Sequence, residues 1–270
     1  FMLIIWLQGI WLPLHGYSYE STPLWAGIYL LPMTAGFLLA GPVAGSLSDR
    51  RGARPFTVGG MVLMAATFVG LVLLPVNFDY RVFAALVFLN GLGGGIFTAP
   101  NSAVVMSSVP ADQRGAASGV RATFFNAGTS LSIGIFFSLM VIGLANTLPA
   151  ALAAGLQQRG VSAGVADQVA NTPPVGSLFA AFLGYNPIAE LLAPSGALAT
   201  PGVDAEALTG HSFFPQLISG PFHTGLAVVF AAAAVMMLLG ALASWRTPGH
   251  YAVEPTGAVS RAPTRGRGAR

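Results

Sequence analysis

Charged side chains are scarce in this sequence. Asp, Glu, Lys and Arg together make up 8% of the 270 residues, whereas a soluble domain carries about 25%. So few charges cannot cover a water-facing surface, and the composition therefore predicts that lipid surrounds much of the chain. A hydrophobic share of 54% and a mean hydropathy of +0.70 agree with this. The net charge is only +3 and the arginines are dispersed, which argues against a nucleic-acid partner.

Cysteine is absent, which excludes disulfides, thiolate metal sites and cysteine nucleophiles. The sequence also lacks HExxH, GxSxG and phosphate-loop motifs. An intramembrane hydrolase would need a Ser and a His at one depth, but Ser118 and His223 fall near opposite ends of their apolar runs. We therefore expect no enzyme activity, no cofactor and no metal.

Six apolar runs predict membrane-spanning helices. They cover residues 1–14, 24–45, 56–76, 81–107, 116–144 and 222–245. At 1.5 Å per residue the first run reaches only about 21 Å of a hydrocarbon core ~30 Å thick. It also lacks the basic start and cleavage site of a signal peptide, so we expect a fragment that begins inside a helix. We expect residues 1–246 to form an all-α six-helix membrane bundle, followed by a disordered tail at 247–270.

The arginines predict the orientation of this bundle. With six crossings, alternate connections share a side, and one side then carries ten of the twelve basic residues. These are Arg50, Arg51, Arg54, Arg114, Arg121, Arg246, Arg261, Arg265, Arg267 and Arg270. The other side carries only Arg81 and Arg159. The asymmetry predicts that the tail is cytoplasmic and that the long connection 147–220 is extracellular.

The connection 147–220 is far longer than a usual loop. It contains helix-like pieces at 148–158 and 177–192, and prolines interrupt it at Pro173, Pro174, Pro194 and Pro201. Two interpretations stay open. The segment is either a tolerated surface insertion or a lid over an outer vestibule.

A short basic decapeptide, Gly45-Ser-Leu-Ser-Asp-Arg-Arg-Gly-Ala-Arg54, separates the second and third apolar runs. We expect it to be a loop. Asp49 could cap the N-terminus of an adjacent helix and pair with an arginine, and Gly52 would permit a sharp turn. The decapeptide is either a latch between two helix bundles or a basic loop that only sets topology.

This decapeptide resembles the signature loop of the major facilitator superfamily. The matching residues are Gly45, Leu47, Asp49, Arg50, Gly52 and Arg54, and only Ala53 departs, where a basic residue is usual. The loop also joins the second and third helices, as in that family. Stretches 21–27, 91–95 and 114–119, with the long outer segment, are similar to its fourteen-helix drug:proton antiporter branch.

The resemblance covers nearly all of residues 1–246 and implies the C-terminal half of a secondary transporter in a bacterial plasma membrane. This half would rock against an N-terminal partner around a midplane site. The resemblance implies export of drugs or amphipathic small molecules in exchange for protons. The alternatives are transport of another small solute by the same fold, or a membrane scaffold that transports nothing.

Polar and aromatic residues inside the apolar runs predict a substrate pathway, because polar groups are costly in lipid and tend to face a cavity. The candidates are Gln8, Asn90, Phe97, Thr98, Asn101, Phe124, Asn126 and Ser130. Thr129 shares a predicted face with the last two. The alternative role for the polar members is helix–helix hydrogen bonding, worth about 0.6–2 kcal/mol each.

Arg114 and Arg121 complete the predicted gating set, and Arg121 could pair with Asp112 or Asp49 or extend to the membrane surface. The glycine pairs 41/45, 91/95 and 115/119 have the GxxxG spacing of close helix contacts. No carboxylate lies deep in any run, since Glu20, Asp49, Asp79 and Asp112 are at boundaries or in loops. If the protein is proton-driven, we expect the titrating carboxylate in the missing N-terminal half.

Overall fold

A computed structural model describes residues 1–183 and 185–246, and within these ranges the secondary structure is helical with no strand. The prediction of an all-α fold is confirmed. The predicted tail at 247–270 lies outside the described residues. Five helical stretches are long and apolar enough to cross a membrane, and Met2–Leu14 is a shorter apolar helix, so the six expected helices are all found.

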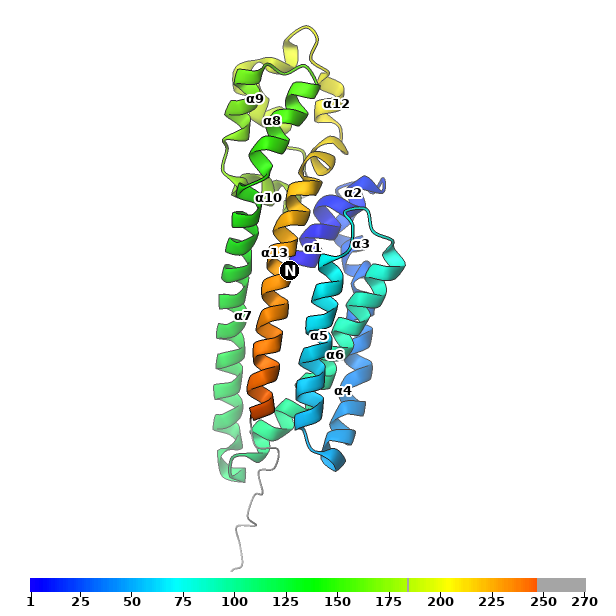
Figure 1. Ribbon diagram of the computed structural model, residues 1–270, viewed down its shortest axis with the longest axis vertical. Coiled ribbons are helices and arrows are strands. Elements are labelled where there is room, and N and C mark those ends of the chain that lie inside the picture. The colour runs from blue at the N-terminus through cyan, green and yellow to red at the C-terminus, as the bar shows by residue number, and fades with distance from the viewer. Residues whose placement is uncertain (184, 247–270) are drawn as a thin grey trace, which may run out of the picture.

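The spanning helices carry the labels of Figure 1. They are α3 (Thr22–Tyr29) continued by α4 (Leu31–Arg51), α5 (Arg54–Val72), α6 (Tyr80–Ser107), α7 (Arg114–Ala145, preceded by the 3-10 turn Ala111–Gln113) and α13 (Phe213–Arg246). The first apolar run forms α1 (Met2–Trp6), a π-helical segment (Leu7–Trp11) and α2 (Leu12–Leu14). Neighbouring helices pack in the order α7, α13, α5, α6, α4.

The decapeptide is mostly helical, which corrects the predicted loop. Helix α4 continues through Asp49 to Arg51, and α5 begins at Arg54. Only Gly52 and Ala53 lie between them, and Gly52 has φ 82°, a left-handed conformation that favours glycine. The helix can continue because its arginines reach the headgroup level from the last turn. The last span likewise begins at Phe213, earlier than the predicted residue 222.

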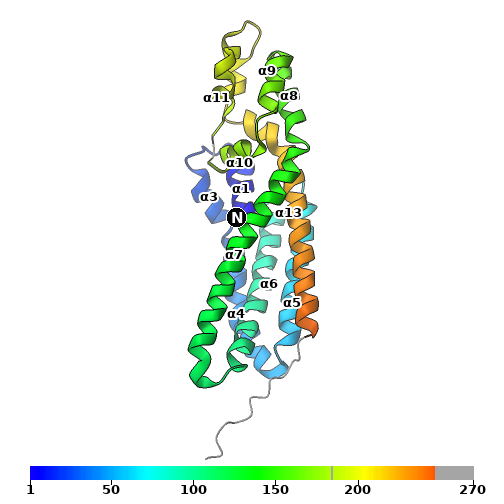
Figure 2. The same cartoon turned by 90° about the vertical axis from the view of Figure 1, so that its left-hand side faces the viewer.

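The connections alternate between the two ends of the bundle as predicted (Figures 1 and 2). The Gly52 turn, the turn after α6 and the end of α13 lie at one end, called here the lower end. The connection that follows α2 and the long segment between α7 and α13 lie at the opposite, upper end. Of the eight arginines that the structure describes, six therefore belong to the lower end, and Arg81 and Arg159 belong to the upper end.

Glycines 91–95 let α6 approach two helices at once. A Cβ added at Gly91 would lie 1.9 Å from the carbonyl oxygen of Met33 on α4, and one at Gly95 would lie 2.6 Å from that of Phe37. On another face, a Cβ at Gly93 would lie 2.9 Å from the carbonyl oxygen of Gly60 on α5. This predicted glycine pair is thus a true packing face, whereas added Cβ atoms at Gly115 and Gly119 meet nothing within 4 Å.

The upper segment is a small helical assembly. Its helices are α8 (Leu148–Gln158), α9 (Ala163–Ala170), α10 (Pro174–Leu183), α11 (Ile188–Leu192) and α12 (Ala205–Thr209). The predicted piece 148–158 is correct, but 177–192 is two helices, because the chain turns before Pro187. Helix α10 packs on the first apolar helix so closely that a Cβ at Gly9 would lie 2.5 Å from the carbonyl oxygen of Ala181.

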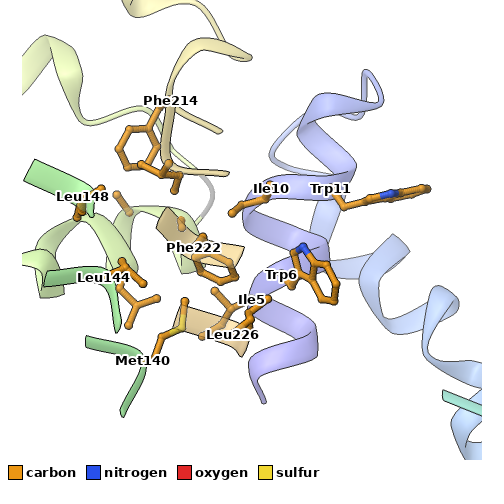
Figure 3. Close-up of a cluster of buried hydrophobic side chains, with 14 of the residues drawn as sticks. Ile5, Trp6, Ile10, Trp11, Met140, Leu144, Leu148, Phe214, Phe222 and Leu226 are labelled. Atoms are coloured by element: carbon orange, nitrogen blue, oxygen red, sulfur yellow. The ribbon is translucent and has the colours of Figure 1, made fainter. Parts of the chain in front are cut away.

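A buried cluster joins the first helix to α7 and α13 (Figure 3). Ile5 and Ile10 point toward Phe222 and Leu226 of α13, and Met140 and Leu144 approach from α7. These side chains are almost completely buried. The cluster lies in the upper half, so the lower halves of the helices are held by other contacts.

Candidate functional site

A cavity of about 640 Å³ opens among α1, α4, α5, α6, α7 and α13. Its walls are mainly apolar, and they include the aromatic rings of Phe1, Phe68, Phe124, Phe125, Phe136 and Phe230. Three lining residues have polar side chains, namely Asn90 on α6 and Thr129 and Ser132 on α7. None of its lining side chains is charged. Such a space suits an organic molecule with aromatic surface and few charges.

The predicted pathway residues are only partly brought together here. Asn90 and Phe124 line the cavity, and so does Thr129. The other candidates, which do not line it, are Gln8, Phe97, Thr98, Asn101, Asn126 and Ser130. Ser130 borders a separate shallow groove with Leu131 and Gly134. Gln8 is buried in the π-helical segment.

The sequence-based prediction missed most of the cavity face of α7. The lining positions 125, 129, 132 and 136 repeat at intervals of four, three and four residues, which is one helical stripe. Asn126 and Ser130 are each displaced by one residue, or about 100° around the helix, from this stripe. The cavity face could have been predicted from the helical spacing of Phe125, Thr129, Ser132 and Phe136. The prediction used polarity alone and therefore chose Asn126 and Ser130, which lie beside this face.

Asn90 fulfils the helix–helix role and also borders the cavity. Its side-chain Nδ2 donates to Thr67 Oγ1 on α5 at 2.8 Å, and the Thr67 hydroxyl donates to the carbonyl oxygen of Met64 at 2.7 Å. Thr67 is buried, so this hydrogen bond forms away from solvent. The two interpretations of Asn90 are therefore compatible.

At the lower end, the signature residues divide into two groups. Arg54 lies over the ring of Trp245 at 5.0 Å, a cation–π contact that joins the start of α5 to the end of α13. Thr57 and Ser244 share a hydrogen bond of 2.7 Å beside it. Asp49 and Arg50 are exposed, and both extend from the last turns of α4.

Asp49 does not cap α5, the helix that follows it. The N-cap residue of α5 is Ala53, and no side chain caps this helix. Asp49 belongs to the C-terminal turns of α4, where Arg50 and Arg51 interact favourably with the negative end of the helix dipole. Gly45 contributes an ordinary contact, since a Cβ there would lie 3.8 Å from the Cβ of Ala99. Leu47 is exposed.

Arg121 does not form the expected ion pair. Its guanidinium donates instead to the hydroxyl of Ser102 on α6. Among the described residues the ion pair found joins Arg159 and Asp204 in the upper segment, at 3.3 Å. Arg114 begins α7 and is exposed.

A cluster of aromatic side chains lies at the upper end of the bundle. The sequence did not predict it. The Trp11 ring stacks on His15 with centroids 3.9 Å apart, and its Nε1 donates to the carbonyl oxygen of Phe78 at 3.2 Å. The hydroxyls of Tyr17 and Tyr29 share a hydrogen bond of 2.7 Å. Aromatic rings with one polar edge favour membrane interfaces, so this cluster agrees with an interface at this level.

Tyr19 connects this end to the upper segment. Its hydroxyl donates to the carbonyl oxygen of His211 at 2.7 Å. Burial raises the pKa of Tyr19 to about 12. The hydroxyl therefore keeps its proton, and can donate this hydrogen bond, to a higher pH than an exposed tyrosine would.

Comparison with known proteins identifies the family. The sequence profile of the Major Facilitator Superfamily matches residues 1–133, about half of the chain. The methyl viologen resistance protein SmvA of Salmonella typhimurium is 31% identical over 163 residues, which are 59% of this chain and 32% of that protein. The tetracenomycin C resistance and export protein of Streptomyces glaucescens is 26% identical over 241 residues, or 89% of this chain and 39% of that protein.

A third relative, the riboflavin transporter RibZ of Clostridioides difficile, is 28% identical over 123 residues, 46% of this chain and 27% of that protein. The matched regions thus span about a quarter to two fifths of these curated relatives. No solved structure gives a significant match. With the signature turn between its second and third spans and its bundle of apolar helices, the chain belongs to the major facilitator superfamily, a family of membrane transporters and not of enzymes.

Proposed function

We propose that this chain forms the C-terminal six-helix half of a secondary transporter in a bacterial plasma membrane, which exports amphipathic small molecules in exchange for protons. The observation that carries the proposal is the cavity of about 640 Å³ between the helices, with six phenylalanine side chains and no charged side chain in its walls. Relatives named for resistance to methyl viologen and for export of tetracenomycin C support an organic substrate.

Helices α4 and α7 each present apolar side chains that nothing in this chain covers. Leu38 and Leu39 of α4 are 66% and 62% exposed, and Phe124 and Phe125 of α7 are 75% and 73% exposed. Residues 121–131 of α7 are all exposed. The two phenylalanines also line the cavity. We propose that the N-terminal half packs on this face of α7 and completes the pathway, so that rocking of the halves alternates access.

The lower end would face the cytoplasm, because it holds six of the eight arginines that the structure describes. In this orientation Asp49 and Arg50 are free to contact the N-terminal half, while Arg54 is held by Trp245 within this half. The proposed latch is thus an interaction between halves. The outer segment would lie outside the cell, with α10 above the cavity side of the first helix.

Proton coupling needs a titrating group within the membrane. The five long spanning stretches hold acidic residues only in the last turns of α4 and in the turn before α7, at Asp49 and Asp112. Neither lines the cavity. We therefore propose that the carboxylate that exchanges protons belongs to the N-terminal half.

A second candidate function is transport of another small solute by the same fold. The relative named as a riboflavin transporter favours this alternative, because riboflavin combines an aromatic ring system with many polar groups. The polar residues Asn90, Thr129 and Ser132 could serve such a solute. A broad range of exported compounds would favour the first proposal, and a single substrate the second.

The test expresses the complete natural protein in a bacterial strain that lacks its own efflux pumps. We expect cells to accumulate less of a fluorescent aromatic dye such as proflavine than cells with an empty vector, and a protonophore to abolish the difference. Equal accumulation with and without the protein, across several aromatic dyes, would contradict drug export. A difference that survives the protonophore would contradict proton coupling alone.

A further inference from the structure

The hydrogen bonds around Asn90 fix the direction of its side-chain amide. The single hydroxyl proton of Thr67 goes to the carbonyl oxygen of Met64, at 2.7 Å. Thr67 Oγ1 can then only accept, so the atom of Asn90 that lies 2.8 Å from it must be the NH₂ group. The amide cannot turn over without breaking this bond inside the bundle.

The carbonyl oxygen of Asn90 is consequently open to the cavity. No described hydrogen bond uses Asn90 Oδ1, and this oxygen is not among the buried polar atoms that lack a partner. Because Asn90 is a lining residue, the accessible oxygen faces the space that a ligand would occupy. The cavity wall therefore presents a hydrogen-bond acceptor in a fixed position.

The other polar groups of the wall add to this acceptor character. The Thr129 hydroxyl donates its proton to the carbonyl oxygen of Phe125 at 2.8 Å, so it offers the cavity only an oxygen. The Ser132 hydroxyl is free to donate or accept. No carboxylate or cation is present to neutralise a ligand charge. A ligand that supplies N–H or O–H donors satisfies these oxygens, whereas an apolar ligand leaves them unpaired.

We infer that the cavity selects planar aromatic compounds that carry N–H or O–H donors, and that Asn90, oriented by Thr67, distinguishes them from their methylated analogues. This inference rests on the proposed function and names the substrate class of the same cavity. The phenylalanine rings bind the aromatic faces of both kinds of compound. Asn90 stabilises only the compound whose amino or hydroxyl substituent donates to it, because a buried acceptor without a partner is unfavourable.

The test uses two dyes with one ring system. Proflavine carries amino groups on an acridinium ring, and acridine orange carries dimethylamino groups at the same positions. The ring N–H is common to both dyes, so only the amino N–H donors differ. We expect the purified complete protein to bind proflavine about fivefold more tightly than acridine orange, the effect of roughly one hydrogen bond. Fluorescence titration measures both affinities.

Variants of Asn90 and Thr67 test whether the preference for proflavine over acridine orange comes from the Asn90 side chain. Asn90→Leu should remove the preference, because it weakens proflavine binding about fivefold more than acridine orange binding when the amide acceptor is lost. Asn101→Leu is the matched control on the same helix, and it should keep the preference because Asn101 does not line the cavity. Thr67→Val should weaken the preference, and Thr67→Ser should keep it, which tests the orienting bond even if Asn90→Leu folds poorly.

The inference is overturned if Asn90→Leu keeps the preference, or if it weakens both dyes to the same extent. Equal affinity of wild type for both dyes, with export of both intact, overturns the inference and leaves the proposed function standing. Failure of the complete protein to bind or export either dye overturns both.

Discussion

At the scale of single residues, the closest contacts in the bundle are made by glycines. Gly91 and Gly95 bring α6 onto α4, and Gly93 meets Gly60 on α5. Small residues at such positions let helix backbones approach closely. In lipid, the resulting van der Waals contacts take the place of the hydrophobic driving force that water supplies to soluble proteins. The glycine spacing predicted this face, but it also predicted Gly115 and Gly119, where an added Cβ meets nothing within 4 Å.

Replacement of Gly91 by alanine should destabilise the bundle by about 1–3 kcal/mol, because the added Cβ would meet backbone atoms of Met33 that cannot move aside. Thermal unfolding of the complete protein in detergent measures the effect. Gly59→Ala is the matched control, since its Cβ meets nothing within 4 Å. An unchanged melting temperature for Gly91→Ala would show that α4 and α6 are farther apart than described.

Tyr19 supplies a prediction with a defined pH range. Its pKa is raised by burial from 10.0 to about 12 in the folded protein. A raised pKa gives stability that is complete below pH 10 and is lost as the pH rises toward 12, because the unfolded tyrosine ionises first. The melting temperature should therefore fall more steeply across this range for wild type than for Tyr19→Phe. Parallel curves would mean that Tyr19 is not buried against His211.

At the scale of elements, the sequence predicted which segments are helical better than where they end. Long apolar runs identify spans because lipid requires internal backbone hydrogen bonds. The observed helix ends differ from the predicted ends, because α4 continues into the basic decapeptide and α13 begins within the outer segment. Hydrophobic periodicity does not encode the π-helical segment, whereas Pro187 was a sequence signal for the division of α10 from α11 that the prediction did not use.

The cavity shows the same limit. The polarity of Asn90 correctly identified α6 as a lining helix. On α7, the predicted residues Asn126 and Ser130 lie one position away from the residues that line the cavity. A shift of this size changes which side chains face inward, since successive residues are 100° apart. The sequence could suggest which helices line the pathway, whereas the rotation of each helix is set by its neighbours.

Helix α8 provides a test of the upper segment as a folded unit. Leu156 is completely buried, and its replacement by alanine should cost about 2–5 kcal/mol locally. We expect faster protease cleavage within 147–212 and no change in the membrane helices. Gln157→Ala is the control because Gln157 is exposed on the same helix. Equal cleavage rates would contradict a packed assembly.

At the scale of the whole molecule, the proposed latch is an interaction between halves. Asp49→Asn in the complete protein should lower transport by roughly tenfold or more, as expected for the loss of a charge-assisted contact worth about 1.5–3 kcal/mol. Dye efflux from loaded cells measures the rate. Asp79→Asn is the control, because Asp79 caps α6 at the opposite end and asparagine also caps well. Unchanged efflux by Asp49→Asn would leave only a topogenic role for the turn.

The central claim is that lipid surrounds these helices, with the arginine-rich end in the cytoplasm and the upper segment outside. The chain contains no cysteine, so single cysteines can be introduced without background labelling from these 270 residues. We choose Ala111→Cys in the exposed turn before α7 and Ala199→Cys in the exposed upper segment. In intact cells, a membrane-impermeant maleimide should label Cys at position 199 at once and at position 111 only after permeabilisation. Labelling of both positions from the same side would contradict the account.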